Sequence, residues 1–216
     1  NTDHGPLLRI YEEARQVPGI KHCFIGSGIR YDLCLSDTGN KEVDKTNRRY
    51  LETVIRHHVS GRFKVAPEHC SPTVLGLMRK PAFGLFQQLK SIFDEINRKH
   101  RLNEQIIPYF ISSHPGCPPE DMAELAVATK ALDFKLEQVQ DFTPTPMTVA
   151  TTIYYSGYHP YSLQKIDTAK SEKEKKQQNM FFFWYKREFR EQIMTLLRRI
   201  HRADLIPKLY GKEREK

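Results

Sequence analysis

Residues 62–80 read RFKVAPEHCSPTVLGLMRK, and this stretch sets the pattern of the whole chain. Arg62 to Ala66 is a short apolar run of the kind that forms a buried β-strand. Ser71-Pro72 then supplies a helix N-cap and a first-turn proline, and Val74, Leu75 and Met78 follow at helical spacing. Pro81 ends that helix. The stretch therefore predicts one unit of strand, polar loop and helix.

The same order of strand and helix recurs along the chain. Four strands are predicted, at His22–Gly26, Arg62–Ala66, Ile106–Ile111 and Phe134–Val139. Their starts near 22, 62, 106 and 135 are about 40, 44 and 29 residues apart, which suits helices that return each strand parallel to the last. The sequence thus predicts an α/β fold, a partial TIM-like barrel of about four parallel strands with outer helices. A helix over Leu7 to Val17 comes first, so we expect the natural preceding strand to be missing.

The last quarter of the chain differs from the rest. We expect an aromatic loop at 154–161, a charged linker at 171–178, one long amphipathic helix from Phe182 to Ile200 and a frayed basic tail at 208–216. This divides the chain into a barrel portion, 1–161, and an extension, 162–216.

Charge is concentrated in that extension. The 216 residues carry a formal net charge of +8, with 34 basic and 26 acidic side chains, and 15 basic against 8 acidic residues lie from Lys165 onward. No run approaches the roughly 20 apolar residues that a membrane helix needs, so we expect a soluble, cytoplasmic protein. Cys23, Cys34, Cys70 and Cys117 match no zinc or cluster spacing and are expected to be reduced, mostly buried thiols.

Polar clusters follow each predicted strand at its C-terminal end. They are Ser27–Asp32, Pro67–His69, Ser112–Gly116 and Gln140–Pro144. In parallel βα barrels the loops at this edge converge into the active site. Four loops that agree are stronger evidence for a site than any one motif.

Each cluster also has a structural interpretation. Arg30 and Asp32 either form a loop ion pair or bind a carboxylate or phosphate through the guanidinium. Glu68 and His69 suit ligand binding or proton transfer, as well as a surface loop. His114 precedes a Pro-Gly turn that lets the backbone approach a ligand, yet it could be a loop histidine with its hydrogen bonds made. Gln140 and Asp141 could form hydrogen bonds with hydroxyl or amine groups of a ligand, or cap a turn.

The sequence lacks the motifs of several common binding and catalytic sites. A glycine-rich phosphate loop, a Gly-x-Ser-x-Gly elbow and a His-Glu-x-x-His zinc helix are all missing. His57-His58 is interpreted as a helix-end pair rather than a metal site.

The loops and their strands resemble the C-terminal half of a YgiQ-type radical S-adenosylmethionine protein. The resemblance rests on KVAPEHC at 64–70 with the VLGLMRKP helix at 74–81, IPYFISSHPG at 107–116, EQVQDFTPTPMTVAT at 137–151, and Ser27 to Asp32. It implies cofactor contacts from Val65, Glu68, Met78, Arg79, Ser112, Gly116 and Gln140, with the Phe142 ring packed against the adenine. The resemblance also gives four candidates for substrate binding: Arg30, Asp32, His69 and His114. Two of them, His69 and His114, are also candidates for proton transfer.

One departure from this family concerns the [4Fe–4S] cluster. The family holds it through Cys-x-x-x-Cys-x-x-Cys, whereas the closest two cysteines here are 11 apart, and cluster ligands must meet at one point. We therefore expect no metal ligand in this chain and expect the motif upstream of Asn1. The intact protein would be the enzyme, with this chain inactive alone, and its partners would be the missing N-terminal part and a reductant such as flavodoxin or ferredoxin.

A second function class remains open from the residues alone. The basic C-terminal helix could track RNA, with bases stacking on Tyr154, Tyr155, Tyr158 or Tyr161, in a binding module without catalysis. A separate expectation concerns assembly: an incomplete barrel would leave the strand near His22 as an edge that could pair with another chain.

Overall fold

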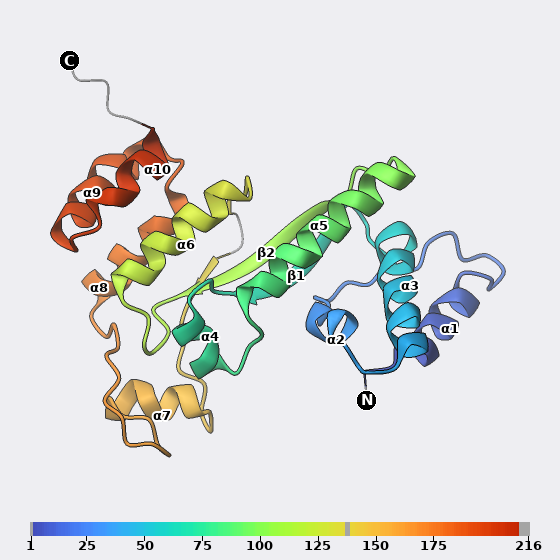
Figure 1. Cartoon of the computed structure of the whole chain (residues 1–216), viewed down its shortest axis with the longest axis horizontal. Helices are drawn as coiled ribbons and strands as arrows, with labels where there is room; N and C mark the ends of the chain where they lie inside the picture. Colours follow the sequence, from blue (N-terminus) through green and yellow to red (C-terminus); the bar gives the residue numbers. More distant parts are fainter. Residues whose placement is uncertain (1, 137–138, 212–216) are drawn as a thin grey trace. The chain divides into compact units, whose positions relative to one another are not determined.

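The computed structural model describes residues 2–136 and 139–211, which form an α/β structure around a small parallel sheet (Figure 1). The described strands are β1 (Arg62–Glu68), β2 (Gln105–Ser112) and β3 (Val139–Asp141), in the order β1-β2-β3. Phe110 pairs with Val139 and Ser112 with Asp141. The predicted α/β class is confirmed; over the described ranges the sheet is open rather than a closed barrel.

Alternating burial explains why these segments are strands. In β1 the side chains of Phe63 and Val65 are buried, and in β2 those of Ile106 and Phe110 are buried, with less buried residues between them. Helices follow the strands as the sequence predicts: α4 (Pro72–Met78) and α5 (Phe83–His100) after β1, and α6 (Pro119–Ala131) after β2. Ser71 caps α4, accepting a hydrogen bond from the Val74 amide at 3.5 Å.

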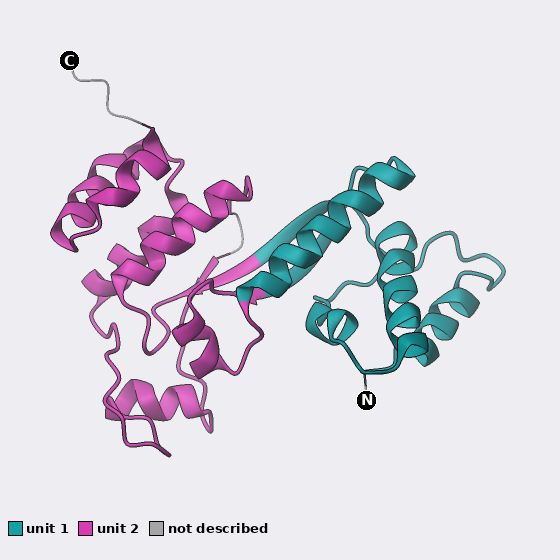
Figure 2. Cartoon of the chain, viewed as in Figure 1, with its two compact units in different colours: residues 1–66, 83–108 teal, residues 67–82, 109–216 magenta. Residues whose placement is uncertain are grey.

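The chain divides into two compact units, shown in Figure 2. Unit 1 comprises residues 1–66 and 83–108. It contains α1 (Gly5–Ala14), α2 (Tyr31–Leu35), α3 (Lys41–His57) and α5, and α3 packs against the other three. Its largest fully buried side chains include Leu51, Ile55, Phe86 and Leu89.

Unit 2 comprises residues 67–82 and 109–216. Besides α4 and α6 it contains α7 (Val149–Ser156), α8 (Glu172–Asn179), the 3₁₀ helices η1 (Met180–Phe183) and η2 (Ala203–Leu205), α9 (Arg187–Arg199) and α10 (Ile206–Tyr210). Buried Phe181, Phe182 and Ile193 lie in its core, and α6 packs against η1, α8 and α10. The expected boundary between 161 and 162 falls inside this unit.

The predicted strand His22–Gly26 is wrong. This segment makes isolated backbone hydrogen bonds, such as Ile25 N to His58 O at 2.8 Å, and forms no ladder. Ile25 is bonded to the C-cap of α3, so its amide is satisfied by a helix end instead of a neighbouring strand. The described residues therefore contain three strands rather than four, and the edge expected near His22 is not a strand.

The C-terminal region also differs from expectation. The single helix over 182–200 is interrupted, because Lys186 is extended between η1 and α9. At this break the Tyr185 hydroxyl donates to Leu136 O at 3.0 Å. The charged linker is helix α8, begun by a capping box between Ser171 and Glu174.

Three further segments complete the comparison. The aromatic loop begins inside α7, and α10 occupies part of the expected tail. The fourth predicted strand, Phe134–Val139, is misplaced: residues 134–136 are not in a strand, residues 137–138 lie outside the described residues, and β3 begins at Val139. Among the described helices, none has the length and apolar character to cross a bilayer.

Candidate functional site

A cleft in unit 2 gathers polar side chains at the carboxyl ends of the strands. Its volume is about 550 Å³, within the usual range for small-molecule sites. Glu68 ends β1, Ile111 lies near the end of β2, and Gln140 and Asp141 end β3. The remaining lining residues come from α4 and its C-terminal end, from the loop after β2, and from the segment leading into α7: Leu77, Met78, Arg79, Lys80, His114, Phe142, Thr143, Thr145, Thr148, Val149 and Ala150. We call this the strand-end cleft.

Phe142 forms an aromatic wall of the cleft. Only 7% of its surface is exposed. Its ring centroid lies 5.0 Å from that of His114, edge-on, and 5.7 Å from that of Tyr154. The Phe142 amide donates to Ser112 O at 2.8 Å, which extends the β2–β3 pairing by one residue. The wall is thus fixed by both packing and backbone.

Charged side chains line the cleft, among them Glu68, Arg79 and Lys80. Glu68 and Arg79 both have positive φ, 66° and 54°, so the chain turns sharply after β1 and at the C-cap of α4. The Glu68 carboxylate pairs with Lys80 Nζ at 3.0 Å. The Arg79 guanidinium is exposed and has no side-chain partner among the described residues. One ion pair and one further cation suit a ligand that carries its own charges.

Asp141 is anchored at the end of β3. Its Oδ1 accepts hydrogen bonds from the Ser112 hydroxyl and from Asn179 Nδ2, the latter at 3.0 Å. Both bonds end on the same oxygen, so Oδ2 can accept a hydrogen bond from a hydroxyl or amine in the cleft.

His114 is a buried, neutral imidazole at the base of the cleft. It is 4% exposed, and burial lowers its pKa below the ordinary value. Nδ1 lies 2.9 Å from Pro115 O, so the proton resides on Nδ1 and Nε2 carries the lone pair. The imidazole is therefore prepared to accept a proton or a hydrogen bond at Nε2.

His69 has different surroundings. It is fully buried, its Nδ1 accepts from the Ser71 amide at 3.0 Å, and its Nε2 lies 3.4 Å from Met122 Sδ and 3.5 Å from Cys117 Sγ. Burial lowers its pKa to about 3. These contacts give His69 a packing role behind the loop, and it does not line the strand-end cleft.

The structure brings six of the predicted site residues together in the cleft: Glu68, Met78, Arg79, His114, Gln140 and Phe142. Ser112 is buried against Asp141, and Gly116 faces Leu77 in a neighbouring cavity of unit 2. Val65, Arg30 and Asp32 belong to unit 1 and are not among the lining residues. Of the two interpretations of Arg30, the structure contains the ion pair, with Nη2 and Asp32 Oδ2 2.6 Å apart.

The predicted cluster Gln140–Pro144 included Thr143, but sequence reasoning missed the other two hydroxyl groups of the cleft, those of Thr145 and Thr148. Thr143, Thr145 and Thr148 lie in the segment TPTPMT between β3 and α7. Thr148 caps α7, accepting from the Thr151 amide at 3.2 Å. A threonine directly before an apolar run is a helix N-cap signal, and Thr148 before Val149 could have identified the start of this helix.

The cysteines do not form a metal site. Among residues 2–136 and 139–211, no group of three or more His, Cys, Asp or Glu side chains could hold a metal ion. Burial raises the pKa of the Cys34 and Cys70 thiols to about 12, so both stay protonated near neutral pH.

The described residues thus form an α/β structure with a cleft of this size at the carboxyl edge of its parallel sheet, which is a common place for ligand sites. Residues 137–213 match the family model "Domain of unknown function (DUF3362)". The chain is 60% identical to a UPF0313 protein of Bacteroides thetaiotaomicron and 57% identical to one of Porphyromonas gingivalis, each over 98% of this chain, and 41% identical to one of Methanocella arvoryzae over 95%. The chain is thus similar to UPF0313 proteins over nearly its whole length, and it spans 33–34% of the length of these three relatives.

Proposed function

We propose that this chain supplies S-adenosylmethionine and substrate contacts to a radical S-adenosylmethionine enzyme whose cluster ligands lie elsewhere in the intact protein. The observation that carries the proposal is the strand-end cleft. It gathers Glu68, Met78, Arg79, His114, Gln140 and Phe142, which come from three separate strand ends and their loops. Residues so far apart in sequence meet at one place because parallel strands expose their carboxyl ends at one edge.

The cleft fits the cofactor by its chemistry. Phe142 offers a flat apolar wall for an adenine ring, and the Asp141 carboxylate has an oxygen for a ribose hydroxyl or an amine. Arg79 offers a cation for the carboxylate of the methionine moiety. A cluster does not fit the described residues, because they contain no suitable ligand group. We therefore assign only the organic cofactor to this chain.

The chain's own residues would bind, orient and exclude water. In enzymes of this class, reductive cleavage of the bound cofactor supplies a radical that abstracts hydrogen from the substrate. His114 Nε2, as a neutral acceptor, can hold or receive a proton from a group in the cleft. The Phe142 and Tyr154 rings shield one side of the cleft from solvent.

Titration calorimetry of the 216-residue chain with S-adenosylmethionine should show saturable binding. We expect Phe142→Ala to weaken that binding about 5- to 150-fold, since an adenine stacked on an aromatic ring gains about 1–3 kcal/mol. Gln140→Ala tests the same cleft with an exposed side chain whose loss leaves the core intact. Phe24→Ala, an exposed ring in unit 1, is the matched control. Binding that none of these variants changes, or no binding at all, would overturn the assignment.

The cluster half of the proposal is tested on the intact protein. We expect the coding sequence upstream of Asn1 to contain Cys-x-x-x-Cys-x-x-Cys, and anaerobic reconstitution of the full-length protein to incorporate four irons. The partners we propose are that upstream part and a reductant such as flavodoxin or ferredoxin. An upstream sequence without the three cysteines would rule out the radical mechanism and leave cofactor binding as a separate question.

A further inference from the structure

The chain after α7 displays aromatic rings to solvent. Tyr155, Tyr158 and Tyr161 are 70%, 49% and 72% exposed, and Leu163 next to them is 73% exposed. We call residues 155–166 the tyrosine hairpin. Large rings are usually found on a surface in such a group only where something covers them.

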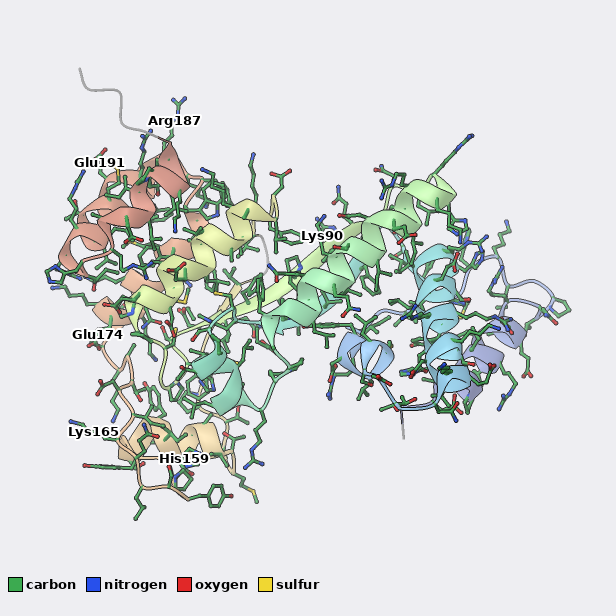
Figure 3. All side chains as sticks on the ribbon, in the orientation of Figure 1. Lys90, His159, Lys165, Glu174, Arg187 and Glu191 are labelled. Atoms are coloured by element: carbon green, nitrogen blue, oxygen red, sulfur yellow. The ribbon has the colours of Figure 1, made fainter. Side chains whose placement is uncertain are left out.

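Backbone hydrogen bonds hold the tyrosine hairpin in shape. Tyr158 and Lys165 form an antiparallel bridge, His159 N donates to Gln164 O at 2.9 Å, and Ile166 N donates to Gly157 O at 2.8 Å. Inside the turn the His159 ring accepts from the amides of Tyr161 and Ser162 at 3.4 and 3.3 Å. The rings therefore project from an ordered turn. Figure 3 labels His159 and Lys165 on this hairpin.

Lysines accompany the rings. Lys165 lies in the hairpin itself, Lys170 Nζ donates to Tyr155 O at 3.2 Å, and Lys175 Nζ lies 5.2 Å from the Tyr154 ring centroid. Three acids lie in the same segment: Glu172 binds Lys176 at 2.7 Å, Glu174 closes the capping box with Ser171, and Asp167 lies two residues after Lys165. The five lysines of residues 165–176 outnumber them. The local surface is thus aromatic and cationic.

The basic face of α9 is a weaker candidate for this role. Its apolar stripe, including Ile193 and Leu197, is buried in unit 2. Two of its cations have intramolecular partners: Arg190 lies over the Tyr210 ring at 5.0 Å, and Arg199 donates to Gln177 at 3.0 Å. Helix α9 also presents no group of exposed rings beside its charges.

We propose that the tyrosine hairpin, with Lys165, Lys170 and Lys175, binds single-stranded nucleic acid, with bases stacked on Tyr155, Tyr158 and Tyr161. Sequence-tolerant binding of single strands combines ring faces for bases with cations for phosphates, which is the combination displayed here. A protein partner would use the rings without needing the lysines. The inference goes beyond cofactor binding and does not depend on it.

Fluorescence anisotropy with labelled twelve-nucleotide oligo-U and oligo-dT tests the proposal on the 216-residue chain. We expect Tyr155→Leu and Tyr161→Leu each to weaken binding about 5- to 100-fold, and the Tyr→Phe variants to bind like wild type, because stacking needs the ring and not the hydroxyl. With three or four phosphate contacts, affinity should fall about 20- to 50-fold between 50 and 200 mM salt. Tighter binding of oligo-U than of oligo-dT would identify RNA as the ligand, and the reverse would identify DNA.

The control is Ile10→Ala, an exposed apolar position in unit 1. Equal binding of wild type and the Tyr→Leu variants would overturn the proposal, because charge alone would then explain the affinity. Equal affinity for a duplex would count against stacking in the same way. If neither oligonucleotide binds at 50 mM salt, the proposed nucleic-acid surface is rejected, and a protein partner becomes the explanation for the exposed rings.

Discussion

Replacing Gln178 with leucine should lower the free energy of unfolding by about 2–6 kcal/mol. Gln178 is 2% exposed and reaches from α8 into the loop after β2. Its Oε1 accepts from the Ser113 amide at 2.8 Å and its Nε2 donates to Cys117 O at 2.7 Å. Leucine is of similar size but leaves both buried backbone groups without partners, and each such group costs about 1–3 kcal/mol.

The neighbouring glutamine provides the control. Gln177 is partly exposed and its side-chain contact is to Arg199 at the surface, so Gln177→Leu should change stability by less than about 0.5 kcal/mol. Urea unfolding followed by circular dichroism measures both variants. The same two hydrogen bonds hold the loop that carries His114, so Gln178→Leu should also weaken cofactor binding. Equal unfolding midpoints for the two variants would show that Gln178 does not support this loop.

Acid should destabilise the protein through His69. Its pKa is lowered to about 3 by burial in the folded chain, against an ordinary value of about 6.5 in the unfolded chain. Between these two values the unfolded state binds more protons, so stability is complete above pH 6.5 and falls as the pH is lowered toward 3. The slope approaches 1.4 kcal/mol per pH unit, which amounts to about 2 kcal/mol lost between pH 7.5 and pH 5.

Urea unfolding at half-unit steps of pH measures this dependence, and His69→Asn should reduce it. A smaller dependence of the same sign should remain from His114, whose pKa is also lowered by burial. Asparagine can still accept the Ser71 amide bond that His69 Nδ1 accepts, but it cannot take up a proton. His201→Asn, at an exposed position of positive φ that asparagine tolerates, is the control and should leave the dependence unchanged. A wild-type profile that is level between pH 7.5 and 5 would show that His69 can be protonated without unfolding.

The candidate site was predicted in part. Glu68, Gln140 and Phe142 could be placed because each lies within three residues of the end of a predicted strand. His69 and His114 look alike in sequence, each close behind a strand, yet one lies behind the loop and the other lines the cleft. The backbone has positive φ at Glu68 and at Ser113, and this sets the direction in which each loop leaves its strand. The residue types at these two positions do not indicate a positive φ.

Local patterns alone determined the α/β class, β1, β2 and the start of α4, because alternating apolar residues and capping residues act within a few positions of one another. Only tertiary structure decided that His22–Gly26 is not a strand, that the C-terminal helix breaks at Lys186, and that Gln178 belongs to the loop after β2. Those outcomes depend on partners far away in the chain: His58 for Ile25, Leu136 for Tyr185, and Ser113 for Gln178. A buried backbone or side-chain polar group must find a hydrogen-bond partner, and the sequence near it does not specify which distant group that will be.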